Sequence, residues 1–305
     1  MTTENRWSSI SDIARTNHNI LATLLKDQSL SGYNDSVNIS WATNGYPYPY
    51  ASPILMEHIS GVNCKLIRPR VFKHPTLQTL RSKNRAEVFT PAWICNAQNN
   101  LVDERWFGRK DVFNTEFVAT DGTRSWHTKK DPIEFPSEKS WMQYIRCRRL
   151  EMACGEAPYL ASRYDTTTGI QIPIGERIGI LDRKFRVINE NTPPKPTKSN
   201  KRKWLRKAYQ ALQSVYGFDW QGDNVFLSRE SLFLSFCEYY FQRWQRMPHT
   251  NAMQKAAEII SWNIWQMDGT KFTIPDTDHL CQIMEWHGTE PLKGKRIIFK
   301  KLITK

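Results

Sequence analysis

The sequence predicts a mixed α/β fold with a mostly parallel sheet. Two apolar, strand-like runs, in residues 149–160 and 214–236, each carry an acidic residue beside small residues. A helical pattern of apolar residues begins near residue 204, and strands that alternate with helical segments favour a parallel sheet. No internal repeat of roughly 20 to 50 residues is evident, which argues against solenoids and propellers.

Composition sets the broad class of the protein. A chain of 305 residues can form one large domain with an appended segment, or two small domains. Its 12 tryptophans argue against general disorder, because that much aromatic area needs burial or a ligand. The sequence has no long apolar run and no start typical of a signal peptide, so we expect a cytoplasmic protein that makes no use of a membrane.

The charge favours a polyanionic partner. The formal net charge is +13, and nucleic acid is the commonest partner of so basic a protein, although solubility alone is the alternative. Lysines and arginines gather in residues 65–73, 81–85, 146–149 and 195–207. Such clusters can contact phosphates without reading a base sequence.

The first 80 residues predict an irregular, partly helical region, followed by an α/β domain over residues 81–305. Residues 10–30 have a rough apolar face that indicates a short helix with Ser11 as its N-cap. Residues 41–55 alternate tyrosine and proline, which predicts an extended loop. Its tyrosines, which we expect to pack on the domain rather than stack on bases, are Tyr46, Tyr48 and Tyr50.

Two later segments look like long insertions. Residues 111–140 are polar and rich in turn formers, and residues 165–203 lose periodicity before ending in a stretch rich in proline and lysine. We expect that end to be a solvated basic loop. Helices are predicted from residue 203 and over residues 237–247, and Trp262 and Trp265 are candidates for the core.

No metal site is expected. The cysteines are scattered without a paired Cys/His spacing, so we expect them to be reduced and structural; they are Cys64, Cys95, Cys147, Cys154, Cys237 and Cys281. The histidines show no spacing that links them to a nucleophile or a metal.

The run RLEMACGEAPYL, in residues 149–160, predicts a strand, a small-residue turn and a helix. Gly155 and the nearby Ala153 and Ala157 would let the backbone approach a ligand, and the start of the helix would favour an anionic group. The apolar run before Asp219 predicts a second strand that ends in an acid and leads into another helix. Each segment, taken alone, is also compatible with an ordinary turn and a capping carboxylate.

In their order along the chain, these segments resemble the DNA adenine-N6 methyltransferases of restriction-modification systems. The run AEVFTPAWICN resembles the Phe-Thr-Pro segment that helps hold the methionine part of S-adenosylmethionine, with Phe89, Thr90 and Pro91 at its positions. The run LEMACGEAPYL resembles the first glycine-rich motif of the family. Its matching positions, which the resemblance assigns to cofactor binding, are Glu151, Ala153 and Gly155.

Two further motifs extend the resemblance. The run YGFDWQGDN resembles the second motif, which implies that Asp219 takes the ribose hydroxyls and that Trp220 lies against the cofactor adenine. The run WNIWQMDG resembles the third motif, in which Asp268 would receive the adenine amino group. The resemblance covers about residues 86–269 and implies a Rossmann-like fold, S-adenosylmethionine as cofactor and DNA as partner.

The chain departs from the family at its catalytic motif. No Asn/Asp-Pro-Pro-aromatic tetrapeptide follows Asp268, and the one Pro-Pro pair, Pro193-Pro194, precedes the second motif and lacks the aromatic residue. Ala157 also stands where the family often has a second glycine. The catalytic residues are therefore unknown, and we expect either a second protein subunit that supplies the motif or a shortened relative.

Two other functions compete with this interpretation. The first is a non-catalytic DNA-binding or regulatory component of a restriction system. The second is a metal-dependent nuclease that uses Asp276, Glu285 and His287, in which histidine stands where such sites have lysine.

Overall fold

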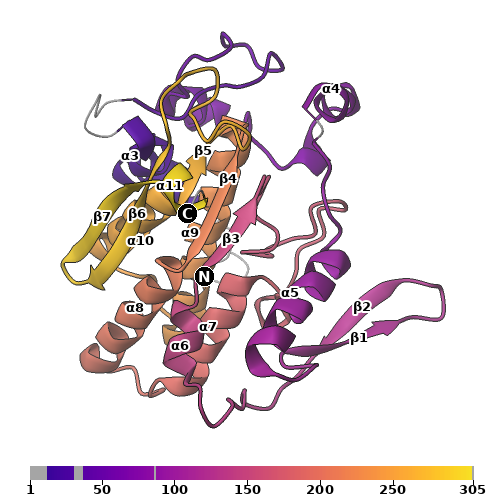
Figure 1. The fold of residues 1–305 in the computed structure, drawn as a ribbon, viewed down its shortest axis with the longest axis vertical. Coiled ribbons are helices and arrows are strands. Elements are labelled where there is room, and N and C mark those ends of the chain that lie inside the picture. Colours follow the sequence, from indigo (N-terminus) through magenta and orange to yellow (C-terminus); the bar gives the residue numbers. More distant parts are fainter. Residues whose placement is uncertain (1–11, 31–36, 86, 304–305) are drawn as a thin grey trace.

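The computed structural model describes residues 12–30, 37–85 and 87–303. At its centre lies a parallel three-stranded sheet with the strand order β3-β4-β5, flanked by two antiparallel hairpins (Figure 1). The strands are β1 (Asn114–Val118), β2 (Arg124–Thr128), β3 (Arg149–Met152), β4 (Val215–Asp219), β5 (Ile264–Gln266), β6 (Gln282–Thr289) and β7 (Leu292–Ile298). The predicted mixed α/β class is confirmed, with a parallel sheet smaller than a mostly parallel fold implies.

Helices connect the parallel strands. Two of them join β3 to β4 and two join β4 to β5, which gives the predicted alternation of strands with helices. The helices from residue 141 to residue 263 are α6 (Trp141–Arg146), α7 (Ile180–Asn191), α8 (Lys198–Leu212), α9 (Gly222–Trp244) and α10 (Thr250–Asn263). None of the helices in the described ranges is long and apolar enough to cross a membrane.

Short elements precede the sheet. The helix predicted in residues 10–30 is divided at Asn17, whose side chain accepts a hydrogen bond from the Ile20 N–H and starts the second helix; Ser11 lies outside the described residues. The elements up to residue 107 are α2 (Ile13–Thr16), α3 (His18–Leu25), η1 (Gln28–Leu30), η2 (Met56–His58), η3 (Gly61–Asn63), η4 (Arg70–Phe72), α4 (Pro75–Arg85) and α5 (Ala92–Phe107). Two short helices lie later in the chain, η5 (Ile174–Glu176) and α11 (Lys300–Ile303).

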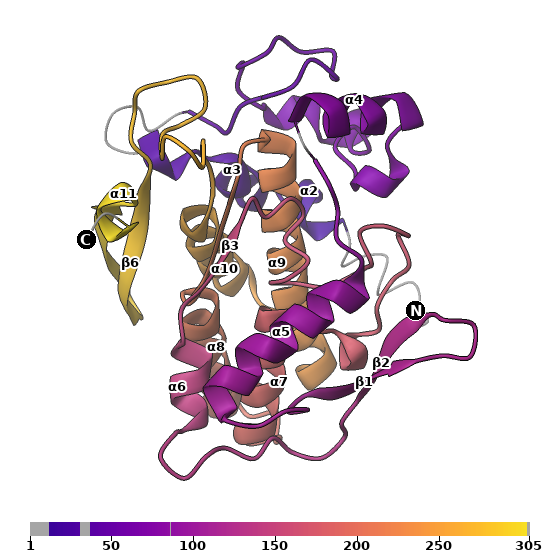
Figure 2. The ribbon, with the colours of Figure 1, turned by 45° about the vertical axis from the view of Figure 1, so that its right-hand side comes forward.

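The two faces of the sheet are covered differently. Alternate side chains of a strand point to opposite faces, so Val215 and Ile264 join the large core beneath α9 and α10. Phe218, Trp265 and Met267 point the other way, into a smaller core that the C-terminal segment covers. Figure 2 shows β6 along one edge of the molecule and hairpin β1–β2 projecting at the other. Trp265 is therefore a core residue, as predicted.

The tyrosine-rich segment in residues 41–55 is irregular, as predicted. The ring centres of Tyr46 and Tyr48 lie 4.4 Å and 5.4 Å from that of the buried Trp41. These two tyrosines therefore pack on the domain, as expected.

Residues 165–203 were predicted to be an insertion that ends in a solvated loop, and the structure shows that this prediction is wrong for much of the segment. Residues Ile180–Asn191 form α7, and α8 begins at Lys198, directly after Thr197, whose side chain accepts from the Asn200 N–H. Buried apolar residues of α7 such as Leu181, Phe185 and Ile188 follow helical spacing, but charged residues interrupt the run. Asp182, Arg183 and Lys184 are buried too, and each makes at least one polar contact. The lysines beyond residue 197 thus stand on a helix rather than in a solvated loop. Within the other segment predicted as an insertion, 111–140, the chain forms hairpin β1–β2.

Candidate functional site

A cavity of about 570 Å³ lies at the carboxyl ends of β3 and β4. Its walls come from the chain between α4 and α5, the turn after β3, and the end of β4 with the start of α9. The lining residues are Lys83, Glu87, Val88, Phe89, Thr90, Glu151, Ala153, Cys154, Gly155, Pro158, Tyr159, Asp219, Trp220, Gln221 and Asn224. Ligands of open parallel sheets bind at this end of the strands, which makes the cavity the candidate site.

The cavity gathers most of the residues that the sequence predicted. Among its lining residues are Phe89, Thr90, Glu151, Ala153, Gly155, Asp219 and Trp220, although up to 131 positions separate them in the chain. Pro91 is not a lining residue and stands at the N-cap of α5. Asp268 is not a lining residue either. Its Oδ1 atom accepts from the N–H groups of Thr270 and Lys271 at 2.8 Å and 3.2 Å, so it shapes a turn after β5.

Gly155 holds the turn after β3 close to β4. Its φ angle is +53°, in the left-handed region, and its N–H donates to Asp219 Oδ2 at 2.9 Å. Its carbonyl accepts from Ser228 Oγ of α9 at 2.6 Å. The glycine therefore joins the turn after β3, the end of β4 and α9 at one point.

The helix predicted directly after this turn is absent. The next α-helix is α7, which begins at Ile180. Ala157 adopts φ +57° and is followed by Pro158, and a residue before proline is disfavoured in a right-handed helix. Residue 157, where the resembling family often has glycine, thus has a backbone conformation that glycine adopts most easily. A phosphate-binding helix N-terminus is accordingly missing from this turn.

The side chain of Glu151 holds the segment after β3 in place through buried hydrogen bonds. Its carboxyl group is buried and accepts from the backbone N–H groups of Tyr159 and Leu160 at 3.4 Å and 3.2 Å. Burial raises the pKa of Glu151 well above its usual range, and the nearby Asp219 acts in the same direction. The sequence assigned Glu151 to the cofactor, and the structure adds a role in shaping the cavity wall.

Asp219 sits at the junction of the walls. One carboxyl oxygen accepts from Gly155, and the other accepts from the Gln221 N–H at 2.8 Å and from Asn224 Nδ2 at 3.3 Å. Burial raises the pKa of Asp219 to about 6, against these hydrogen bonds, which lower it. Oδ1 thus accepts two hydrogen bonds and Oδ2 accepts one, which leaves Oδ2 a second lone pair for a ligand.

Gln221 is a candidate binding residue that the sequence did not reveal. Its side chain is 3% exposed and lines the cavity, and neither its Oε1 nor its Nε2 atom has a hydrogen-bond partner among the described residues. An unsatisfied buried amide costs about 1–3 kcal/mol per group, so it marks a position for a polar ligand. Its place one residue after Trp220 in the second motif is the only sequence signal for it.

A buried ionic network supports the wall that α4 forms. Arg81 Nη1 lies 2.9 Å from Asp223 Oδ2, and Arg81 Nη2 lies 2.5 Å from Glu87 Oε1. Lys73 Nζ donates to the same Asp223 oxygen at 2.8 Å. Asn224 donates to Glu87 at 2.9 Å, which connects the network to the cavity. Two of the cations predicted for phosphate contacts, Lys73 and Arg81, are therefore buried in ion pairs.

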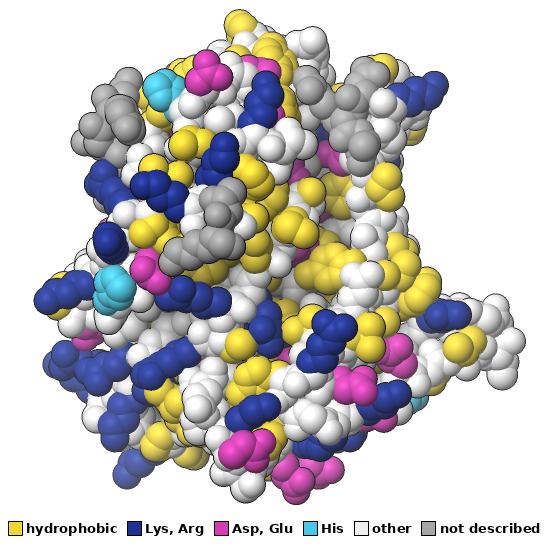
Figure 3. Space-filling view, in the orientation of Figure 1, with side chains coloured by type: hydrophobic (Ala, Val, Ile, Leu, Met, Phe, Trp, Pro, Cys, Tyr) yellow, Lys and Arg dark blue, Asp and Glu magenta, His cyan; other side chains and the backbone are white. Residues whose placement is uncertain are grey.

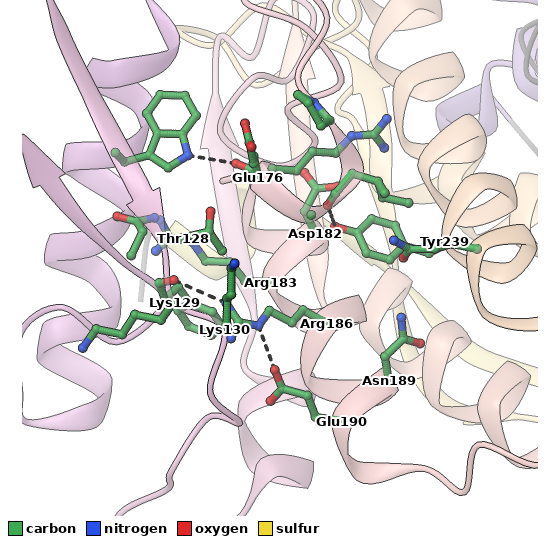
Figure 4. A pocket seen from close by; sticks show the side chains of 18 of the residues that line it. Thr128, Lys129, Lys130, Glu176, Asp182, Arg183, Arg186, Asn189, Glu190 and Tyr239 are labelled. Atoms are coloured by element: carbon green, nitrogen blue, oxygen red, sulfur yellow. Dashed lines mark hydrogen bonds and ion pairs between the residues drawn. The ribbon is translucent and has the colours of Figure 1, made fainter. Parts of the chain in front are cut away.

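A larger cavity of about 920 Å³ lies between hairpin β1–β2 and α7. Figure 4 shows the Arg186–Glu190 ion pair among its side chains, and the two groups lie 2.7 Å apart. Arg183 likewise pairs with Asp103 at 2.6 Å. Its arginines thus hold the scaffold together, and the smaller cavity, where the predicted residues meet, remains the candidate site.

The residues considered for a nuclease are engaged elsewhere. Asp276 accepts from Tyr50 Oη at 2.6 Å, and Glu285 pairs with Arg148 at 3.1 Å. Within the ranges that the structure describes, no three acidic, cysteine or histidine side chains form a group able to hold a metal ion.

Comparison with known proteins adds no relative: no family model matches the chain, and neither a curated protein nor a solved structure shows significant similarity to it.

Proposed function

We propose that the cavity binds S-adenosylmethionine, and that the protein is the cofactor-binding part of a DNA adenine methyltransferase with a Rossmann-like core. One observation carries the proposal. Segments that resemble the Phe-Thr-Pro, first and second motifs of that family meet in a single cavity at the carboxyl ends of adjacent parallel strands. The resemblance assigns the three motifs to one cofactor, and a shared cavity is what that assignment requires.

The charge of the cavity suits this cofactor. Three carboxyl groups line it, Glu87, Glu151 and Asp219, against one lysine, Lys83. Arg81 already pairs with Glu87, and burial favours the neutral form of Glu151, so Asp219 is the carboxylate that a cationic group of the cofactor would stabilise. The volume of about 570 Å³ is within the range of roughly 300–1,000 Å³ that ligand pockets occupy.

Different lining residues suit different parts of the cofactor. Asp219 would accept from the ribose hydroxyls, and the rings of Trp220 and Phe89 would lie against apolar or aromatic parts of the cofactor. The Gln221 amide can both donate and accept, which matches the edge of an adenine base. S-adenosylmethionine supplies the methyl group when bound, and these residues position it.

Because this chain lacks the catalytic motif, a partner subunit would have to supply it. Strand β3 is the edge of the parallel sheet, and its side chains Leu150 and Met152 are 43% and 71% exposed. An edge strand offers unpaired backbone groups, so a second chain could extend the sheet beside the cavity and contribute the residues that hold the target base.

A non-catalytic DNA-binding component of a restriction system is the second candidate. It is favoured by the position of Asp268 outside the cavity and by the full set of protein donors around Asp219. In that case the fold would serve assembly, and the cavity would not discriminate between adenosyl compounds.

Calorimetric titration of the whole chain with S-adenosylmethionine tests the proposal. We expect saturable binding that Gln221→Leu weakens by tenfold or more, because the buried amide loses its ligand partners. Asp268→Asn is the matched control outside the cavity and should leave binding unchanged. S-adenosylhomocysteine, which lacks the positive charge, should bind more weakly. A folded wild-type chain that binds neither compound at millimolar concentration would leave the assembly role as the better account.

A further inference from the structure

A strongly basic surface lies at the other end of the sheet. Three segments form it: the junction of α6 and β3, the exposed side of α8, and hairpin β6–β7, which packs beside α8. Figure 3 shows their dark-blue side chains gathered along the lower left of the molecule. The basic surface comprises Arg146, Arg148, Lys198, Lys203, Arg206, Lys207, Lys293 and Lys295.

Few acids offset these charges. Residues 192–218, which include all of α8, contain no aspartate or glutamate. The nearby carboxylates are already paired, Glu285 with Arg148 at 3.1 Å and Glu290 with Arg202 at 3.3 Å. Burial and the charges of Arg146 and Arg206 all lower the pKa of Lys207, which indicates that these cations are crowded. Such a surface gains most from an anion that spans several cations.

A hollow of about 330 Å³ lies within the basic surface. Arg146, Arg148 and His287 line it together with the amide side chains of Gln210 and Gln213. Guanidinium and amide donors in a concave site are the groups that contact phosphates and sugar edges.

The apolar residues argue against a lipid surface. Surfaces that lie on membranes place large apolar side chains between their cations. Within the described ranges, neither α8 nor hairpin β6–β7 carries a large apolar side chain that is exposed, and the junction of α6 and β3 has Leu150, which is 43% exposed. The charge is thus arranged for a water-soluble polyanion.

We propose that this basic surface binds the phosphate backbone of a nucleic-acid duplex without reading its base sequence. The inference goes beyond the proposed function, because it holds whether or not the cavity binds S-adenosylmethionine. Ser214, just before β4, lines the hollow, and Asp219, at the end of β4, lines the cavity. Five strand residues span about 16 Å, so the two sites are separate along β4.

The test is fluorescence anisotropy of the whole chain with a labelled 20-base-pair DNA duplex, repeated with an RNA duplex of equal length. The variant is the triple charge reversal Arg146→Glu, Lys203→Glu and Arg206→Glu, at three exposed side chains. The matched control reverses three exposed cations outside the basic clusters, Lys110→Glu, Lys130→Glu and Lys271→Glu, and so changes the net charge equally. Thermal unfolding and S-adenosylmethionine binding are measured on both variants.

We expect the triple variant to bind either duplex at least tenfold more weakly than wild type, and its salt slope, d log K/d log[salt], to be smaller by about 2–3. The control should retain most of the affinity, and both variants should keep any cofactor binding. Equal losses in the two variants would mean that net charge alone attracts the duplex, and would overturn the proposal. Binding to vesicles that contain phosphatidylserine, without binding to either duplex, would overturn it as well.

Discussion

The two ends of β4 differ in where their ionisable side chains lie, buried at one end and exposed at the other. At its carboxyl end, Glu151 and Asp219 are buried and satisfied by backbone N–H groups around a cavity. At its amino end, cations stand exposed on α6, α8 and hairpin β6–β7. Buried charge requires fixed partners and gives a rigid, shaped site, whereas exposed charge costs little and suits a partner that varies. The comparison suggests that one end recognises a small molecule and the other a polymer.

The comparison predicts that removing a buried cation is far more costly than removing an exposed one. Arg81→Ala leaves the carboxylates of Asp223 and Glu87 buried with fewer partners, and we expect it to lower the free energy of unfolding by about 3–5 kcal/mol. Arg202→Ala removes an exposed ion pair with Glu290 and should cost about 1 kcal/mol or less. Urea denaturation measures both. Similar losses in the two variants would contradict the contrast.

The pH dependence of stability sharpens the account of the buried end. The pKa of Asp219 is raised from 3.8 to about 6, so the folded protein holds this proton more tightly than the unfolded chain. The resulting contribution is present at low pH and is lost as the pH rises from about 4 to about 6, on the order of 2–3 kcal/mol.

Asp219→Asn should remove that part of the pH dependence. Asp268 supplies the control with the opposite sign, because hydrogen bonds from Thr270 and Lys271 outweigh its burial and lower its pKa. Its stabilising contribution is lost as the pH falls. Denaturant midpoints from pH 2 to pH 7 distinguish the variants, since the Asp219 effect falls between about pH 4 and pH 6 and the Asp268 effect below pH 3.8. An unchanged profile in Asp219→Asn would refute the assignment.

A smaller effect on stability is expected at Gly155, which has a left-handed backbone conformation. Gly155→Ala should lower the free energy of unfolding by about 1 kcal/mol, because alanine is disfavoured at φ +53°. The added Cβ would lie 3.6 Å from Phe89, an ordinary contact, so the cost is one of backbone conformation. Ala157→Gly, at φ +57°, is the reverse change and should leave stability nearly unaltered. A loss in Ala157→Gly as large as that in Gly155→Ala would argue against the backbone explanation.

The smallest effect on stability is expected at the basic end. Arg148 is 60% exposed in its pair with Glu285, and Arg148→Ala should change the free energy of unfolding by about 0.5 kcal/mol or less. The same substitution should reduce the salt slope of duplex binding by about 1. Denaturation and anisotropy on the same sample compare the two effects. A large loss of stability would mean that this arginine belongs to the scaffold.

Local patterns in the sequence predicted the central elements well. The strand that ends in Asp219 and the helix that follows it have the expected order, and Phe89 and Gly155 lie together at its end. The helix in residues 165–203 was missed. Leu181, Phe185 and Ile188 of α7 follow helical spacing, but they stand among charged residues that the fold also buries, such as Arg183 and Lys184.

Other features of the site depend on contacts between distant segments. Gln221 became a candidate only when its buried amide was found without a partner among the described residues. Conversely, the absence of a helix after Gly155 had a signal, because proline follows Ala157. The turn that keeps Asp268 outside the cavity also had a local signal, since Asp-Gly-Thr favours a turn in which the Asp side chain accepts from the N–H groups that follow it.

Hydrogen exchange on the whole chain, measured with and without S-adenosylmethionine, tests the assignment of the cavity most directly. The account predicts slower exchange in residues 87–90, 153–160 and 219–224, which form the cavity walls, and unchanged exchange in residues 203–213 of the basic surface. Protection confined to other segments, or no protection at a saturating cofactor concentration, would contradict the assignment.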